Sequence, residues 1–305
     1  MESALNSDAG SLTIGPSELD LAHTLTPGQS FRWKCDHQGR WTSVAGRQVI
    51  RVSREGEEIR YEMFPDGPGE EFIRDYFRLD VELSRLYGDF VQADGRIVES
   101  IERFRGLRVI RQAPEETLLS YICSAANSIT RISYAVEVMS KHWGDKIATV
   151  DGHDYYAFPS ALALAHADVG ELARICGLGF RAENIKCVAA QILDRPEGWV
   201  ESLRQASYEE ARRELVNLRC VGLKIADCVL LFALDKDQAF PVDTHIRLIA
   251  VNHYLPEFRQ KTLTPGVYQQ IVEFFQDKFG PFAGWAQEYL FYDDLLRRKP
   301  SQRML

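Results

Sequence analysis

The sequence has no run of apolar residues that approaches membrane-spanning length, no internal repeat and no low-complexity segment. Its first residues, MESALNSDAGS, are polar and partly acidic, which argues against a secretory signal and against an Arg-rich transit peptide. The composition, 45% hydrophobic and 26% charged, is ordinary for a globular chain, and 305 residues suffice for two or three subdomains. We therefore expect a soluble intracellular protein.

Closely spaced cysteines are also absent. No two of them form a Cys-x-x-Cys pair, which argues against a zinc ribbon or a cysteine-held iron–sulfur cluster, and no metal centre is expected. A disulfide framework is not expected in a chain of this size without a signal peptide, so most cysteines are interpreted as small buried hydrophobic residues. The six are Cys35, Cys123, Cys176, Cys187, Cys220 and Cys228.

A strong positive charge is missing as well. The net charge of -8 counts against a protein that binds nucleic acid nonspecifically, because counterion release requires lysines and arginines close to the phosphates. It does not exclude nucleic-acid binding. An acidic protein can still place a few basic side chains and exposed helix N-termini on one face.

The pattern of apolar residues predicts an α+β protein. Between about Gln29 and Phe64, short β-branched and aromatic stretches alternate with turn residues, which indicates an antiparallel sheet. Beyond Pro65 the apolar residues recur at helical spacing. We expect a polar tail over 1–11, an N-terminal antiparallel β-sheet domain over 12–92, a mainly helical body over 93–297 with a hairpin at about 215–235, and a C-terminal tail over 298–305.

Several helix boundaries carry explicit signals. Ser207 begins a capping box, and Thr264 is an N-cap followed by Pro265 in the first turn of its helix. Gly280 is the expected end of that second helix.

The segment LRCVGLKIADC, over 218–228, predicts a helical hairpin. A helix ends, the chain turns through Val221-Gly222, and a second helix begins near Lys224. Such a hairpin offers backbone N–H groups to a DNA phosphate without net positive charge. The second helix is apolar on nearly every face, so it should be buried, and a lysine at its start is unusual. Desolvation and the helix dipole would favour a neutral, nucleophilic amine there.

Each of these residues also has a plainer interpretation. A lone Lys224 could extend from a helix terminus to solvent. Asp243, in the segment FPVDTH, could simply cap the following helix.

The sequence as a whole resembles the helix-hairpin-helix glycosylases with a Gly/Pro-rich loop and a catalytic Asp, and among them the 8-oxoguanine DNA glycosylase family. The similarity spans about residues 12–297 and lies in five separated motifs besides the hairpin. In chain order they are Pro27-Gly28-Gln29-Ser30-Phe31-Arg32-Trp33, Tyr121-Ile122-Cys123-Ser124, Gly177-Leu178-Gly179-Phe180-Arg181, Ala233-Leu234-Asp235-Lys236 and Gly284-Trp285-Ala286-Gln287.

The resemblance implies a bifunctional DNA glycosylase and AP lyase of base excision repair. Lys224 would displace the damaged base by attack at the sugar C1′ and remain joined as a Schiff base, from which β-elimination cuts the strand. Asp243 would stabilise positive charge on the sugar and orient the nucleophile. One helix and a short loop over residues 224–243 would return the carboxylate to the lysine.

The resemblance also implies a pocket for an extruded purine. Cys228 and Phe291 would pack against its two faces, Gln287 would hydrogen-bond its edge, and Pro241 would line the pocket. The carbonyl of Gly28 would accept the N7 proton that 8-oxoguanine has and guanine lacks. Taken alone, Gly28 would be interpreted as a turn residue.

Contacts to the lesion strand are implied at the hairpin and at one histidine. Val221 and Gly222 would bind phosphate through the backbone. His245 would contact a phosphate near the extruded nucleotide, supported by Asp294. A histidine satisfied within the core is an equally acceptable interpretation of His245.

Contacts to the opposite strand are implied at two arginines and an aromatic residue. Arg131 and Arg181 would read the cytosine left behind, with Asn127 beside them, and Phe180 would fill the opened stack.

The chain departs from the family at two places. Ala126 stands where an asparagine contacts the estranged cytosine, so the preference for cytosine should be relaxed. Arg219-Cys220 replaces the usual Pro-Gly of the hairpin, and a residue with a Cβ at 220 should avoid positive φ. This substitution leaves open the hairpin's geometry and any monovalent cation held by its carbonyls.

Two alternative functions remain open. The first is a glycosylase of the same superfamily for another damaged purine, such as an alkylated one. The second is a noncatalytic helix-hairpin-helix module that only holds DNA, which would need neither a buried lysine nor a purine pocket. We expect a monomer that binds double-stranded DNA containing 8-oxoguanine, needs no cofactor, and lies in the cytoplasm or nucleoid of a prokaryote or the nucleus of a eukaryote.

Overall fold

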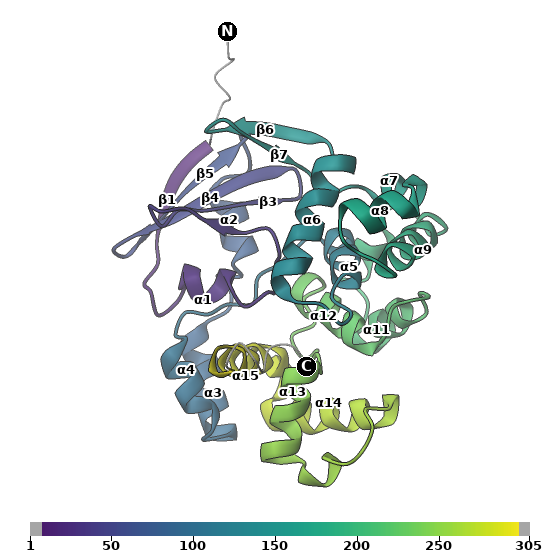
Figure 1. Cartoon of the computed structure of the whole chain (residues 1–305). Helices are drawn as coiled ribbons and strands as arrows, with labels where there is room; N and C mark the ends of the chain where they lie inside the picture. Colours follow the sequence, from purple (N-terminus) through teal and green to yellow (C-terminus); the bar gives the residue numbers. More distant parts are fainter. Residues whose placement is uncertain (1–7, 299–305) are drawn as a thin grey trace.

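The computed structural model describes residues 8–298, and in it the expected sheet is present near the N-terminus (Figure 1). Five antiparallel strands have the spatial order β1-β5-β4-β3-β2. The strands are β1 (Asp8–Thr13), β2 (Lys34–Cys35), β3 (Trp41–Ala45), β4 (Gln48–Glu55) and β5 (Glu58–Phe64). Strands β2 to β5 lie in the stretch where alternation predicted them, and together with the helical body they confirm the α+β class.

Strand β1 begins inside the segment that was expected to be a polar tail. It pairs with β5 from Asp8 opposite Met63 to Thr13 opposite Glu58. Leu12 is its only buried side chain, so side-chain composition gave no sign of it. An edge strand is held by backbone hydrogen bonds, to which polar residues contribute as well as apolar ones.

One face of the sheet packs against short helices. Alternate residues of the central strands, among them Ile50 and Ile59, are fully buried. They meet apolar side chains of α1 (Leu21–Leu25) and α2 (Glu70–Tyr76). This packing gives the sheet its own core and fixes the chain around residues 27–33, which enters the functional site.

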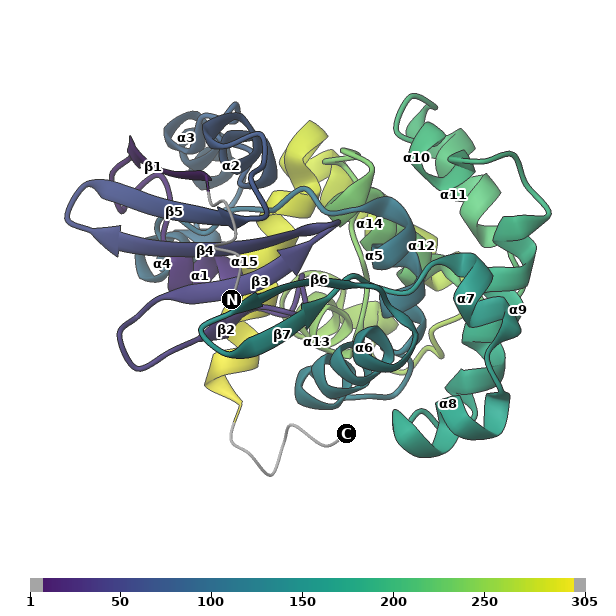
Figure 2. The ribbon, with the colours of Figure 1, turned by 90° about the horizontal axis from the view of Figure 1, so that it is seen from above.

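A second, two-stranded sheet lies over the first, and the sequence analysis did not expect it. Strands β6 (Lys146–Val150) and β7 (His153–Tyr156) are joined by Asp151-Gly152, both with positive φ. An Asp-Gly pair between β-rich segments is a strong hairpin signal, and here it lies within a sequence whose neighbouring segments are helical. The hairpin packs beside β3 and β4, as the view from above shows (Figure 2).

The remaining elements form the helical body. Its helices before the predicted hairpin are α3 (Leu83–Ala93), α4 (Ile97–Arg103), α5 (Pro114–Ile122), α6 (Ile129–Trp143), α7 (Ala161–His166), α8 (Val169–Ile175), α9 (Arg181–Leu193) and α10 (Trp199–Ser202). From the hairpin onward they are α11 (Tyr208–Val216), α12 (Leu223–Ala233), α13 (Thr244–Ile249), α14 (Pro265–Phe279) and α15 (Ala283–Arg297), with the short turns η1 (Ala250–Tyr254), η2 (Pro256–Phe258) and η3 (Gly280–Phe282).

Helix α12 lies at the centre of this body, between α5 and α11 (Figure 1). Every residue from Ala226 to Ala233 is buried, as the all-round apolar pattern predicted. The expected helix signals are confirmed too. Ser207 Oγ accepts the Glu210 amide (3.1 Å), Thr264 Oγ1 accepts the Val267 amide (3.3 Å), and Gly280 ends α14 with φ of +65°.

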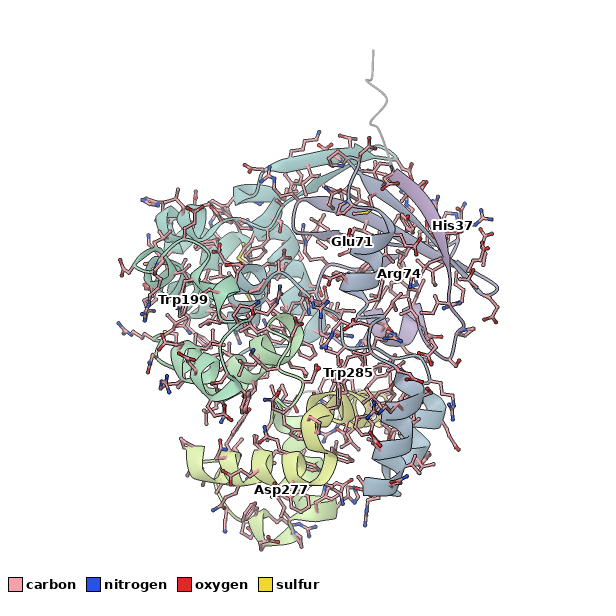
Figure 3. All side chains as sticks on the ribbon, turned by 180° about the vertical axis from the view of Figure 1, so that it is seen from behind. His37, Glu71, Arg74, Trp199, Asp277 and Trp285 are labelled. Carbon is pink, nitrogen blue, oxygen red and sulfur yellow. The ribbon has the colours of Figure 1, made fainter. Side chains whose placement is uncertain are left out.

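Buried charged side chains tie the sheet to the helical body. Arg78 donates two hydrogen bonds to Asp237, and Asp237 also accepts the indole N–H of Trp285 (2.9 Å). Figure 3 labels Trp285 near the middle of the molecule, where α15 begins. These contacts fix the start of α15, the helix that brings several predicted pocket residues to the site.

The cysteines only partly follow the expectation. All six are free, and Cys123, Cys176 and Cys228 are buried, whereas Cys35 and Cys220 are exposed. No helix within residues 8–298 combines the length and the apolar character needed to cross a membrane.

Candidate active site

The predicted hairpin is present and ends at the catalytic candidate. Helix α11 ends at Val216, and α12 begins at Leu223, with Gly222 as its N-cap. Gly222 has no side chain with which to satisfy the first-turn amides of α12, and it is exposed, whereas Val221 is buried. The N-terminus of an eleven-residue helix is thus open toward solvent, an arrangement that suits a phosphate.

The expectation that Cys220 avoids the left-handed region was wrong, because its φ is +74°. The flanking hydrogen bonds explain why. The Val221 amide bonds to the Leu218 carbonyl (3.1 Å), and Gln191 Oε1 accepts the Arg219 amide (2.9 Å). These contacts dictate the path of the turn whichever residue occupies position 220, and a Cβ there costs about 1–2 kcal/mol.

The side chain of Lys224 turns inward rather than out to solvent. Its Nζ donates to Ser124 Oγ (3.1 Å) and lies 5.1 Å from the centre of the Tyr121 ring. Ser124 in turn donates to the Tyr121 carbonyl (2.7 Å). The amine is therefore half-buried and held at a fixed place by the segment that follows α5.

Asp243 is the N-cap of α13, as its plainer interpretation predicted. Its Oδ1 accepts the Ile246 amide (2.8 Å). No ion pair within 4 Å joins it to Lys224 in residues 8–298, yet both charges act on the thiol of Cys228. Both charged groups are therefore near the Cys228 thiol.

Cys228 lies one turn beyond Lys224 on the same helix. Burial raises the pKa of its thiol to about 12, with the charges of Asp227, Asp243 and Glu288 acting in the same direction and Lys224 opposing them. A thiol with this pKa stays protonated at neutral pH, so it does not compete with the amine as a nucleophile. The uncharged Cys228 side chain can therefore form one apolar wall of the predicted base pocket.

Helix α15 contributes the rest of the predicted pocket. Gln287 is 4% exposed, and its Oε1 has no hydrogen-bond partner in the described part of the chain. Phe291 lies one turn later on the same face and is half-buried. Pro241 is buried in the loop before Asp243. A buried acceptor without a partner is costly unless something binds it, and an incoming base edge would do so.

The backbone conformation of Gly28 favours glycine, and a side chain there would also have to displace the end of Ile129. The φ of Gly28 is +93°, and a Cβ at this position would lie 2.6 Å from Cδ1 of Ile129. Its carbonyl accepts a long hydrogen bond from the Tyr121 hydroxyl (3.3 Å). The neighbouring Gln29, which is 2% exposed, fixes this loop through bonds to the backbone of Thr24, Arg108 and Ile110.

His245 is held by a carboxylate and an aromatic ring. Its Nδ1 lies 2.6 Å from Asp294 Oδ2, and its ring meets Phe291 edge to face at 5.3 Å. Burial opposes ionisation of Asp294, but hydrogen bonds from His245 and Arg298 outweigh it and keep the pKa of that carboxyl below its usual range. Because Nδ1 of His245 is bound to Asp294, the other ring nitrogen, Nε2, is left for a second partner.

The four residues predicted to read the opposite strand lie in two neighbouring segments. Phe180 is 63% exposed, and Arg181 stacks on its ring at 4.5 Å while donating to the carbonyls of Ala125 and Ala126 (2.7 Å each). Asn127 bonds only to its own backbone neighbourhood, at Cys123 and Ser128. The exposed guanidinium of Arg131 has no partner among the described side chains.

Two features of the site were missed by the sequence analysis. Ser124 and Tyr121 were noted only as part of a motif, although they hold the lysine. Glu288 was not considered. It is 2% exposed, its Oε1 has no partner in residues 8–298, and burial raises its pKa to about 8, with the Asp243 charge adding to the effect. An acid next to Gln287 on an otherwise apolar helix face was the available signal.

The described residues include no group of three or more His, Cys, Asp or Glu side chains that could hold a metal ion.

Comparisons with known proteins identify the family of this chain. The family described as 8-oxoguanine DNA glycosylase, N-terminal domain, matches residues 11–118. The N-glycosylase/DNA lyase OGG1 of Arabidopsis thaliana is 34% identical over 306 residues, which cover 96% of this chain and 81% of the plant protein.

Two solved structures are similar over nearly the whole chain. MBOgg1 in complex with a low-affinity DNA ligand has a TM-score of 0.84 at 30% identity and covers 98% of each chain. An 8-oxoguanine glycosylase/lyase of Clostridium acetobutylicum, in complex with double-stranded DNA containing cytosine opposite 8-oxoguanine, has a TM-score of 0.80 at 30% identity and covers 90% of this chain and 91% of its own.

Proposed function

This chain belongs to the 8-oxoguanine DNA glycosylase family, and on that premise we propose that Lys224 and Asp243 carry its chemistry. The protein is a bifunctional enzyme of DNA repair, which excises 8-oxoguanine from duplex DNA and cleaves the strand as an AP lyase. The observation that supports the proposed assignment is the half-buried amine of Lys224, which is held by Ser124 one helical turn before the buried Cys228.

The amine of Lys224 attacks C1′ of the damaged nucleotide. A new bond forms between the Lys224 nitrogen and C1′ as the glycosidic bond breaks. The electron pair of the glycosidic bond leaves with the base, and the base takes up a proton. Opening of the sugar then gives a Schiff base between Lys224 and C1′. Loss of a C2′ proton from this intermediate expels the 3′ phosphate, which is the β-elimination that cuts the strand.

Asp243 acts on the sugar rather than on the base. One oxygen caps α13 and is fixed by the Ile246 amide, so the carboxylate cannot rotate away while positive charge develops on the sugar. At the hairpin, Gly222 offers its backbone amide to a phosphate of the same strand, whereas the predicted amide of Val221 is already bonded to the Leu218 carbonyl. His245, oriented by Asp294, binds a second phosphate.

The base pocket distinguishes 8-oxoguanine from guanine by one proton. Cys228 and Phe291 pack on the two faces of the purine, with Pro241 lining the pocket, and the free oxygen of Gln287 takes a donor on its edge. The Gly28 carbonyl, which accepts only one long hydrogen bond within residues 8–298, accepts the N7 proton of 8-oxoguanine. Guanine would place a lone pair against that carbonyl, which favours 8-oxoguanine over an alkylated purine as the substrate.

The remaining contacts are to the complementary strand. Phe180 wedges into the opened stack, and Arg131 and Arg181 read the estranged base beside Asn127. Ala126 lacks the amide that would complete this reading, so discrimination in favour of cytosine is weak.

The enzyme works as a monomer on DNA, in the nucleoid of a prokaryote or the nucleus of a eukaryote, and needs no redox cofactor. A monovalent cation at the hairpin carbonyls fits the backbone, because Cys220 takes the left-handed conformation that a glycine would take.

Borohydride trapping tests the assignment of the nucleophile. Duplexes carrying 8-oxoguanine opposite each of the four bases are incubated with wild type, Lys224→Gln and Lys236→Gln. Lys236 is the matched control, because it is also a half-buried lysine whose amine donates to one oxygen. We expect covalent adducts opposite all four bases that disappear only in Lys224→Gln. An adduct that persists in this variant would contradict the nucleophile, and strict dependence on cytosine would contradict relaxed pairing.

A further inference from the structure

A buried carboxylate lies on the helix of the nucleophile and faces away from the pocket. Asp227 has no exposed surface and follows Lys224 by three residues on α12. Its Oδ1 lies 2.9 Å from Arg212 Nε and accepts the Tyr208 hydroxyl (3.4 Å). Its Oδ2 accepts Arg212 Nη2 (3.0 Å) and the Tyr268 hydroxyl (2.7 Å). Each carboxylate oxygen thus accepts at least one hydrogen bond, and Arg212 neutralises the charge.

Tyr268 connects this carboxylate to the loop that carries Asp243. It lies on α14 and is 4% exposed. Its hydroxyl donates to Asp227 and accepts the backbone amide of Val242 (3.1 Å), the residue before Asp243. A continuous, buried path of hydrogen bonds therefore runs from the helix that carries the amine to the loop that carries the catalytic carboxylate.

The direction of this path is fixed by charge. Burial raises the pKa of Asp227 to about 6, while Arg212 and the two tyrosine hydroxyls oppose a larger rise, so the group is ionised at neutral pH. A carboxylate can only accept, so the Tyr268 proton must point toward it. A lone pair of the tyrosine oxygen is then left for the Val242 amide. Without that oxygen the buried amide would lose its partner, and the loop would shift to regain one.

We propose that Asp227 and Tyr268 are positioning residues for the reaction, which set the separation between the Lys224 amine and the Asp243 carboxylate. The proposal rests on the proposed roles of Lys224 and Asp243. It adds that neither residue is placed by its own neighbours alone. Helix α14 sets the distance between them, because the Tyr268 hydroxyl is hydrogen-bonded both to Asp227 on α12 and to the Val242 amide in the loop before Asp243.

Tyr208 provides a matched control. It is a buried tyrosine, 8% exposed, and its hydroxyl donates to the same carboxylate. It lies on α11 and makes no bond to the loop before Asp243. Tyr268→Phe and Tyr208→Phe each remove one hydroxyl from the same network, but only Tyr268→Phe disconnects Val242.

The experiment measures single-turnover excision of 8-oxoguanine, DNA affinity and the melting temperature for both variants. We expect the rate constant to fall at least tenfold in Tyr268→Phe, because a misplacement of about 1 Å can slow a reaction by 100-fold. DNA affinity should stay within twofold. The rate constant of Tyr208→Phe should stay within twofold of wild type, even if its melting temperature falls as far as that of Tyr268→Phe. A wild-type rate in Tyr268→Phe, or equal losses in both variants, would overturn the proposal.

Two further measurements keep the outcome interpretable. Residual borohydride adduct in Tyr268→Phe should still depend on Lys224, which separates a failure of positioning from a wrong nucleophile. If Tyr268→Phe does not fold, Asp227→Asn takes its place, since it removes the charge that directs the Tyr268 proton. The same loss of rate with unchanged DNA affinity is expected there, and a wild-type rate would overturn the proposal.

Discussion

Replacing the buried acid Glu288 with glutamine should change how stability depends on pH. The carboxyl is 2% exposed and one of its oxygens has no partner in the described residues, so burial raises its pKa from 4.5 to about 8. Between these two values the folded protein binds a proton that the unfolded chain releases. The folded state therefore loses stability as the pH rises from about 4.5 to about 8.

The size of the effect follows from the two pKa values of Glu288. At 1.36 kcal/mol per pKa unit, the difference between 4.5 and about 8 corresponds to at most ~5 kcal/mol. Glu288→Gln keeps the shape but cannot ionise, so it lacks this pH-dependent loss. In urea unfolding from pH 5 to pH 9, the free energy of unfolding of Glu288→Gln should rise relative to that of wild type by up to that amount. The gain should be complete near pH 8.

A surface acid supplies the control for this measurement. Glu102 is exposed on α4, and Glu102→Gln should differ from wild type by less than about 0.5 kcal/mol at every pH. If the difference between wild type and Glu288→Gln does not change with pH, Glu288 does not carry a proton in the folded enzyme, and the reasoning from its burial is refuted.

Three further outcomes are expected. Cys220→Gly should raise the free energy of unfolding by about 1 kcal/mol in urea, because it removes a Cβ from a residue with φ of +74°; a loss would show that the turn is unstrained. Ala126→Asn should increase the preference for cytosine by roughly tenfold in excision assays opposite the four bases, since asparagine tolerates the φ of +48° found there and restores a hydrogen-bonding amide; unchanged ratios would contradict this. Asp243→Asn should keep the melting temperature, because the amide oxygen still caps α13, while excision falls at least 100-fold; Asp243→Ala should lose about 1 kcal/mol of stability as well.

The sequence predicted those parts of the structure that depend on neighbouring residues. The caps at Ser207 and Thr264, the end of α14 at Gly280 and the burial of α12 follow from local chemistry and periodicity, and all are confirmed. Lys224 could be singled out in the same way, because an amine at the start of an apolar helix stands out from its surroundings.

What the sequence could not supply depends on contacts between distant segments. Strand β1 exists because β5 offers it a backbone edge, and Cys220 has positive φ because Gln191 on α9 fixes the turn. Ser124 meets the amine of Lys224 across a separation of 100 residues. Glu288 stands out as an acid on an apolar face of α15, but its burial is decided by the elements packed around that helix.

The contact between Gly28 and Ile129 limits how the enzyme's specificity can change. The loop whose carbonyl is assigned to the damaged base lies against the side chain of the first residue of α6, two residues before Arg131, which is assigned to the opposite strand. A side chain introduced at position 28 would have to displace the end of the Ile129 side chain as well as adopt a positive φ. A substitution made there to alter lesion preference therefore calls for a smaller residue at position 129, and the two positions are best varied together.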